Sequence, residues 1–248
     1  MTRMLLWIAF GLAIQAAPGG AFAQETDVQI DEGNRLAAIL RAGRTVVSSN
    51  QDLINDPGIG DKGLSGDAFL EQVTAAYVAA NGVEPLGPDL TAEERQLTQA
   101  QLDAMAEIVD ENQQLINTPD LGFKGFIPAV FARLVNERFG EKVGDIARVK
   151  VTAPPDLVRN RKARPDPWEA SVISEKFLSP EWTGGQAWSE QVTQDGRAVF
   201  RMLIPEYYSA SCLTCHGEPK GEVDVTGFPK EGGHEGDLGG AISITLYE

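Results

Sequence analysis

Two cysteines and one histidine near the C-terminus have a spacing that attaches a prosthetic group. Cys212 and Cys215 are the only cysteines among the 248 residues, and His216 follows the second one directly. C-x-x-C-H is the attachment signature of c-type haem. Two thiols on one helical turn can reach the two vinyl groups on one porphyrin edge, and the adjacent imidazole can bind the iron as proximal ligand. The motif predicts one covalent haem c held by these three residues.

Three other uses of a C-x-x-C pair compete with haem attachment. A thioredoxin-like redox pair opens a helix within a βαβ unit, which the surrounding sequence lacks. A structural zinc site needs four ligands, and the chain offers only one further histidine, His234, and no further cysteine. A small structural disulfide is the third alternative. The histidine that directly follows the pair favours haem over all three.

The sixth position of the iron has several candidate ligands. His234 lies in the glycine-rich segment 230–236, which could fold over a haem, and a solvated loop histidine is the alternative. Met202 and Met105 are further candidates, although methionines in a strand or helix are more often core residues. Water or an open position completes the set. Methionine ligation would raise the reduction potential, and an open position would admit a diatomic gas.

The N-terminus has the pattern of a secretory signal peptide. Arg3 provides the positive charge, Met4 to Ala17 form an apolar stretch of 14 residues, and Ala21-Phe22-Ala23 is an A-x-A cleavage signature. The apolar stretch is short for a transmembrane span, so an uncleaved anchor is the less favoured alternative. We therefore predict cleavage after Ala23 and a periplasmic mature chain with no membrane segment.

The chain is strongly acidic, with a formal net charge of −15. An acidic surface repels phosphate backbones, which argues against nucleic-acid binding. The same charge favours basic docking partners, because electrostatic attraction steers them to the surface. Apart from its charge, the composition is that of an ordinary globular protein.

The first half of the chain has helical periodicity and an internal repeat. Residues 50–63 and 112–125 are identical at nine of 14 aligned positions. Each copy predicts a helix, an Asn/Pro/Gly turn and a second helix, at 66–80 or 128–139. Thr91 to Glu94 form a capping box for a helix from Ala92 to about Ile116. We interpret the repeat as a duplicated helical hairpin that packs on itself.

The second half has strand periodicity and turn signals. Asp166-Pro167 is expected to open a helix that runs to about Leu178. Asp195-Gly196 between two apolar runs is a strong hairpin signal. The expected strands cover 146–151, 187–192, 198–204 and 238–246. The order of elements predicts an α+β fold with an antiparallel sheet and helices on its faces or at its end.

Several further segments resemble a known family. Residues 156–169, which include Arg-Asn followed by Pro-x-Trp-Glu, Pro205 to Tyr208 and the C-x-x-C-H segment are similar to PAS-like single-haem c-type domains. This family also occurs as extracytoplasmic sensor regions of bacterial signalling proteins. The resemblance covers residues 36–248, most firmly 147–248. It implies a PAS-like antiparallel sheet with flanking helices around a haem.

The resemblance also suggests a division of the chain. Residues 1–23 would be the signal peptide, 24–100 a helical N-terminal extension with the first repeat copy, and 101–248 the PAS-like haem domain. Some family members use a cysteine from the helix before the sheet as second axial ligand. The corresponding stretch here, Glu107 to Asn112, has no cysteine, so the family does not supply the distal ligand.

Four side chains beyond the motif are candidates for haem contact. Arg159 and Arg164, with Arg161, form a basic cluster in an acidic chain, and arginine suits haem propionates. A solvated basic loop is the alternative. Trp168 and Tyr208 are candidate walls of the haem pocket, and ordinary core packing is the alternative.

Three functions compete. A haem-based redox or gas sensor, or a ligand-binding module, follows from the resemblance and would pass its signal to a separate protein. A soluble electron carrier follows from one covalent haem on a charged surface. A haem enzyme such as a peroxidase is least favoured, because no distal His–Arg pair is identifiable. We expect no catalytic residues.

Overall fold

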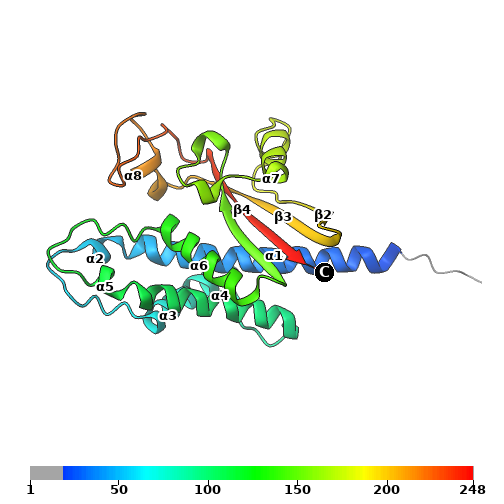
Figure 1. Cartoon of the computed structure of the whole chain (residues 1–248), viewed down its shortest axis with the longest axis horizontal. Helices are drawn as coiled ribbons and strands as arrows, with labels where there is room; N and C mark the ends of the chain where they lie inside the picture. Colours follow the sequence, from blue (N-terminus) through cyan, green and yellow to red (C-terminus); the bar gives the residue numbers. More distant parts are fainter. Residues whose placement is uncertain (1–18, 248) are drawn as a thin grey trace, which may run out of the picture.

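A four-stranded antiparallel sheet lies across a layer of helices in the computed structural model, which describes residues 19–247 (Figure 1). The strand order is β1-β4-β3-β2, so the last strand lies in the middle of the sheet. The strands are β1 (Ala147–Thr152), β2 (Trp188–Gln194), β3 (Arg197–Tyr207) and β4 (Leu238–Tyr247). The predicted α+β class is confirmed.

The helices precede the sheet, apart from short elements in its connections. Before the sheet lie α1 (Gly19–Ser49), α2 (Gln51–Asn55), α3 (Gly66–Asn81), α4 (Ala92–Glu111), α5 (Gln113–Ile116) and α6 (Pro128–Val143). Within the sheet connections lie α7 (Pro167–Val172), α8 (Leu213–His216), the 3₁₀ turns η1 (Pro155–Leu157), η2 (Arg161–Ala163) and η4 (Ala210–Cys212), and the π-helical turn η3 (Ile173–Phe177).

Two predicted helices are interrupted. The expected helix from Ala92 to about Ile116 divides at Asn112, whose ψ of 7° leaves the helical range and whose side-chain amide donates to the Ile108 carbonyl. Asparagine side chains compete with helical backbone bonds in this way. The helix that opens at Pro167 changes after Val172 into η3. Both helix starts follow the sequence, because Thr91 and Asp166 each form a complete capping box.

The main hydrophobic core lies between the sheet and the helices. Residues on alternate positions of β3 and β4, such as Met202 and Ile244, face this core together with Leu36 and Phe131. A smaller core lies on the other face of the sheet, where α7 and η3 cover Leu203. The main core extends from Leu36 to Leu246; the predicted division after residue 100 stays a prediction.

The two repeat copies bond to each other reciprocally at one end of the helical layer. The Asn55 side-chain oxygen accepts from the Lys124 amide at 2.9 Å, and the Asn117 side-chain oxygen accepts from the Lys62 amide at 3.0 Å. A glutamine side-chain amide of each copy also donates a hydrogen bond to the other hairpin. Gln51 donates to the Phe126 carbonyl, and Gln113 donates to the Leu64 carbonyl. The predicted duplicated hairpin therefore packs on itself through equivalent contacts.

The signal-peptide prediction falls mainly on residues 1–18, which lie outside the described residues. Ala21 to Ala23 belong to the first turns of α1, and cleavage after Ala23 stays a prediction. Over residues 19–247, no helix has both the length and the apolar character needed to cross a bilayer.

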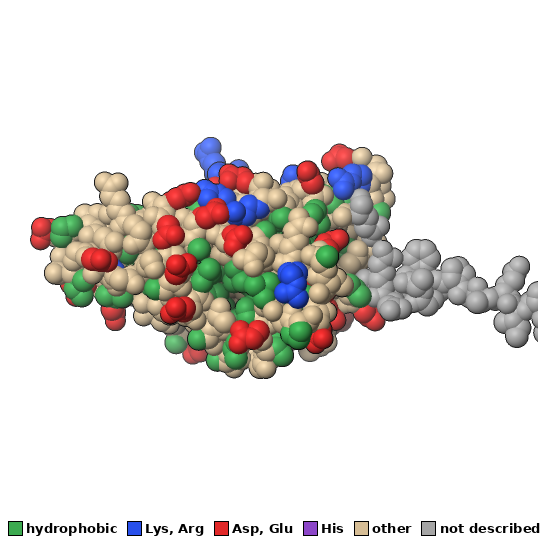
Figure 2. Space-filling view, turned by 90° about the horizontal axis from the view of Figure 1, so that it is seen from below, with side chains coloured by type: hydrophobic (Ala, Val, Ile, Leu, Met, Phe, Trp, Pro, Cys, Tyr) green, Lys and Arg blue, Asp and Glu red, His purple; other side chains and the backbone are tan. Residues whose placement is uncertain are grey.

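The acidic character of the sequence is visible on the surface. Seen from the side of the helical layer, acidic side chains are spread along the molecule and basic ones are fewer (Figure 2). This distribution fits the formal net charge of −15.

One buried carboxylate makes the stability of the helical layer depend on pH. Glu32 of α1 is 4 % exposed and contacts Arg35, which also pairs with Glu94 at 2.9 Å. Burial, aided by the nearby Glu94 and Glu93 carboxylates and opposed by Arg35, raises the pKa of Glu32 from 4.5 to about 7. The folded chain therefore binds this proton more tightly than the unfolded chain.

We expect the free energy of unfolding to fall as pH rises from about 4.5 to 7, because Glu32 then loses a proton that the fold favours. Glu32→Gln should remove this loss. The free energy of unfolding of the variant, relative to that of the wild type, should therefore rise by up to roughly 3 kcal/mol from pH 5 to pH 8. Urea unfolding at both pH values measures the effect. Glu71→Gln, on an exposed site of α3, is the control. Parallel pH profiles for wild type and Glu32→Gln would contradict the assignment.

Candidate functional site

The C-x-x-C-H segment follows directly from the end of a central strand. β3 has a register shift at Glu206/Tyr207, and such shifts re-aim the side chains that follow. Glu206 is held by Arg41 and Arg44 of α1, at 2.7 and 2.6 Å. The chain then passes Tyr208 and enters η4 and α8, which carry the motif. The site is therefore anchored to both the sheet and the longest helix.

The imidazole of His216 is fixed on one edge and on one face. Its Nδ1 lies 2.9 Å from Oε2 of Glu231, and its ring stacks on Tyr208 with centroids 5.1 Å apart and planes 20° apart. An ionised carboxylate only accepts hydrogen bonds, so Nδ1 carries a proton that points to Glu231, and Nε2 is the nitrogen left for a metal. A metal binds Nε2 in the plane of the ring, so stacking on the ring face leaves that position available.

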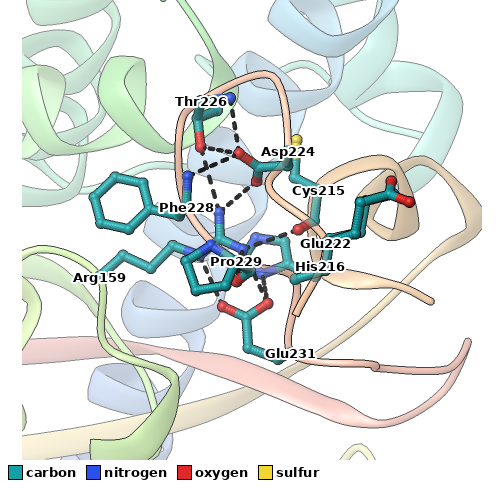
Figure 3. Close-up of polar contacts among 10 residues, drawn as sticks. Arg159, Cys215, His216, Glu222, Asp224, Thr226, Phe228, Pro229 and Glu231 are labelled. Atoms are coloured by element: carbon teal, nitrogen blue, oxygen red, sulfur yellow. Dashed lines mark hydrogen bonds and ion pairs between the residues drawn. The ribbon is translucent and has the colours of Figure 1, made fainter. Parts of the chain in front are cut away.

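Arg159 connects the motif to the loop after it (Figure 3). Its Nε and Nη2 donate to the two oxygens of Glu231, at 2.7 and 3.0 Å. Its Nη1 donates to Asp224 at 2.7 Å, and Nη2 also donates to the Cys215 carbonyl at 2.9 Å. One guanidinium thus holds two loop carboxylates and the backbone of the motif in one arrangement.

These contacts shift the proton affinities of the site. Although burial opposes it, hydrogen bonds from Arg159 and His216 lower the pKa of Glu231. Burial also opposes ionisation of Asp224, yet bonds from Thr226, Arg159 and the backbone hold its pKa far below the usual range. Burial and the nearby Asp224 raise the pKa of the Cys215 thiol. Both carboxylates are therefore ionised at neutral pH.

Tyr208 is packed tightly against the loop that covers the motif. A Cβ on Gly239 would lie 2.2 Å from its ring, and one on Gly233 would lie 2.6 Å from it. The Tyr208 hydroxyl is buried and has no hydrogen-bond partner among the described residues. Burial, aided by Glu231, raises the pKa of Tyr208 to about 12. Positions 233 and 239, which both contact the Tyr208 ring, therefore accept only glycine.

The residues of the site fit a covalent haem. Cys212 and Cys215 are free thiols, each half-buried, rather than a disulfide. His216 presents Nε2 with its other nitrogen already bonded, as ligating histidines do. The unpartnered Tyr208 hydroxyl provides a buried donor beside this imidazole. Cys212 and Cys215 would form the thioether bonds, and His216 would hold the iron.

Comparison with known proteins places the chain in a family. Residues 30–246 match the Tll0287-like family. The chain belongs to the Tll0287-like family. No curated protein and no solved structure matches it.

Two of the predicted site residues of this Tll0287-like chain join the motif. Arg159 reaches the Cys215 carbonyl, and Tyr208 stacks on His216. The donors of Arg159 are taken up by groups of the chain, and a contact with a haem propionate stays a prediction. Tyr208 lies beside the imidazole of His216, and its role as a wall of a haem pocket stays a prediction.

Two other predicted residues lie elsewhere in the Tll0287-like fold. Trp168 donates to Glu190 and stacks under Arg201 at 4.2 Å, against the smaller core on the far face of the sheet. Arg164 is exposed after η2, and its carbonyl accepts from Lys150 at 2.6 Å. None of these contacts reaches the motif, so their roles in haem binding stay predictions.

The side chains that are candidates for the sixth iron position lie in an exposed loop or in the main core. The His234 side chain is 73 % exposed and lies 3.4 Å from Asp237. Met202 and Met105 are buried in the main core of the Tll0287-like fold. The segment of His234 is nonetheless docked, because the Gly233 amide donates to the His216 carbonyl at 2.8 Å. The distal ligand stays a prediction.

Glu231 and Asp224 were not predicted from the sequence. Both lie in the loop of residues 217–236, which has no periodicity and several acidic side chains. Glu231 is three residues before His234, in the segment singled out for that histidine. The only available signal was an acidic residue in a glycine-rich loop after the motif, and it does not indicate which carboxylate turns to His216.

Proposed function

We propose that this chain is a periplasmic mono-haem c-type protein that acts as a redox or gas sensor, or as a ligand-binding module. The observation that carries the proposal is His216, whose Nδ1 is bonded to Glu231 at 2.9 Å while Nε2 stays available beside two free thiols. Membership of the Tll0287-like family, which is c-type cytochrome-like, supports it. When bound, the haem supplies a one-electron couple and, with an open sixth position, a site for a diatomic gas.

A sensing role is supported by the connection between the site and the helices. Glu206 lies two residues before Tyr208 and bonds to Arg41 and Arg44 of α1. A change in the position of the His216 imidazole would act on Tyr208 through their stacked rings. In this proposal the displacement passes through the end of β3 to α1, and from there to a separate signalling protein.

The alternative function is soluble electron transfer, and one observation favours it. Three apolar side chains in the loop that follows the motif are exposed, namely Val223, Val225 and Phe228, at 66, 56 and 44 %. Exposed apolar groups near a redox centre, surrounded by charges, suit short-lived docking of a basic redox partner.

Haem attachment is tested by producing the chain in a host that matures c-type cytochromes. We expect a haem adduct on the peptide that contains Cys212 and Cys215, detected by mass spectrometry of the exported protein. Replacing both cysteines by alanine should abolish covalent haem, because no other thiol exists in the chain. Ser209→Ala, close to Cys212 in the same turn, should retain it. A wild-type chain without the adduct overturns the proposal.

Optical spectra with and without carbon monoxide separate gas sensing from redox sensing and electron transfer. A spectrum that changes with carbon monoxide indicates an accessible sixth position and supports gas sensing. A low-spin spectrum that does not change supports redox sensing or electron transfer. The His234→Ala variant in the same measurement tests the ligand prediction, since an unchanged spectrum excludes His234.

A further inference from the structure

One carboxylate lies between an imidazole and a guanidinium at the centre of the site (Figure 3). Oε2 of Glu231 is 2.9 Å from Nδ1 of His216 and 3.0 Å from Nη2 of Arg159. Oε1 of Glu231 accepts from Nε of Arg159 at 2.7 Å. The guanidinium therefore binds the carboxylate with two parallel bonds, which is the strongest geometry for an arginine and a carboxylate.

We propose that Glu231 is a positioning residue that raises the electron-donating strength of His216 towards the iron, while Arg159 holds the carboxylate in its orientation. The inference rests on the proposed function of the site. A carboxylate that accepts the second N–H of a ligating histidine fixes its tautomer and ring orientation, and it raises the basicity of the ligand. A more basic imidazole stabilises ferric over ferrous iron, so it lowers the reduction potential.

The charges around Glu231 limit the strength of this effect. Arg159 withdraws part of the carboxylate's negative charge, and Asp224 in turn compensates Arg159 at 2.7 Å. The proton therefore stays on Nδ1 of His216, and Glu231 polarises the N–H bond. Along the row from Asp224 to His216, the guanidinium of Arg159 lies between the carboxylates of Asp224 and Glu231, and the row ends at the N–H of His216.

The backbone supports the position of Glu231 independently of its side-chain contacts. The amides of the next two residues, Gly232 and Gly233, donate to the carbonyls of Gly217 and His216 at 3.2 and 2.8 Å. The segment after Glu231 is thus docked directly on the motif. Glu222, another glutamate of this loop, instead pairs with Lys230 and is largely exposed, so it provides a matched control.

The first test compares the midpoint potentials of the matured wild type, Glu231→Gln and Glu222→Gln. Both variants remove one negative charge from the same loop, but only the first changes the partner of His216. We expect Glu231→Gln to shift the reduction equilibrium towards ferrous iron roughly tenfold, which is about 59 mV for a one-electron couple. Glu231→Asp, which restores the charge, should recover part of the shift. Equal potentials for Glu231→Gln and Glu222→Gln overturn the proposal.

The second test uses the chain without haem, so it holds even if a variant fails to mature. Nitrogen-15 NMR distinguishes the two neutral imidazole tautomers, and the chain has only two histidines. At a pH well above the ordinary imidazole value, His216 should carry its proton on Nδ1. Glu231→Leu, which removes the acceptor, should shift the proton to Nε2, with His234 as internal control. A wild-type His216 protonated on Nε2 overturns the proposal.

The two tests separate failure of this inference from failure of the proposed function. If the wild type forms no haem adduct but His216 has the Nδ1–H tautomer in a Glu231-dependent manner, the haem function fails and the positioning contact stands. If the haem is attached but the potential and tautomer are independent of Glu231, the haem function stands and the inference fails.

Discussion

Arg159→Gln is expected to destabilise the folded chain by about 3 kcal/mol, because it removes one partner of a largely buried charge cluster. Asp224, whose side chain is fully buried, would lose its cationic partner, and Glu231 would lose both of its bonds from the guanidinium. The bond from Arg159 to the Cys215 carbonyl would be lost as well. Urea unfolding measured with and without the substitution determines the loss.

Arg161→Gln is the matched control for this prediction, since Arg161 belongs to the same basic cluster but is exposed in η2. Exposed substitutions of this kind usually change stability by about 0.5 kcal/mol or less. If the two variants unfold at the same urea concentration, Arg159 is not the organising residue of the site.

The second large effect is expected for Gly239→Ala at the start of β4. The added Cβ would lie 2.2 Å from the Tyr208 ring, so the ring would have to leave its present position against His216. Overpacking of this kind typically costs about 1–3 kcal/mol. The ring-current shift of the His216 protons in NMR spectra should also change, because it depends on the position of the stacked tyrosine. Unfolding and the proton shift together measure the change.

Two further variants test the cause of this loss. Gly122→Ala adds the same methyl group where no atom lies within 4 Å, so it should be nearly neutral. Tyr208→Leu removes the ring, and the Gly239→Ala substitution should then cost less than in the wild type, since contacting residues are not additive. Additive losses in the double variant would show that Gly239 does not act through Tyr208.

Local signals were sufficient to predict most of the secondary structure. The Asp195-Gly196 turn has positive φ at both residues, 52° and 80°, as its hairpin type requires. The capping residues Thr91 and Asp166 begin their helices where expected. These features depend on a few neighbouring residues, so the sequence determines them directly. The interruption at Asn112 was missed because apolar periodicity continues through it.

The candidate site was predictable only where it is local in the chain. Cys212, Cys215 and His216 lie within five residues, and their spacing identifies them. Which other side chains gather around them depends on strand pairing, since β4 inserts between β1 and β3. That order leads Trp168 to the far face of the sheet and lets Arg159 reach the motif. The non-periodic loop with Glu231 carries no signal of this kind.

The exchanged contacts of the duplicated hairpins link the two copies within the helical layer. Each copy has a backbone amide that bonds to an asparagine of the other copy and a glutamine that donates to a carbonyl of the other copy, across 49 to 75 positions of the chain. A fragment that begins after residue 100 would lose the Lys62 amide that bonds to Asn117 and the Leu64 carbonyl that accepts from Gln113. An insertion that lengthens the loop of one hairpin would likewise break its hydrogen bonds to the other hairpin. The two hairpins are therefore expected to fold together. The sheet shares its main core with them, so we expect it to depend on both hairpins as well.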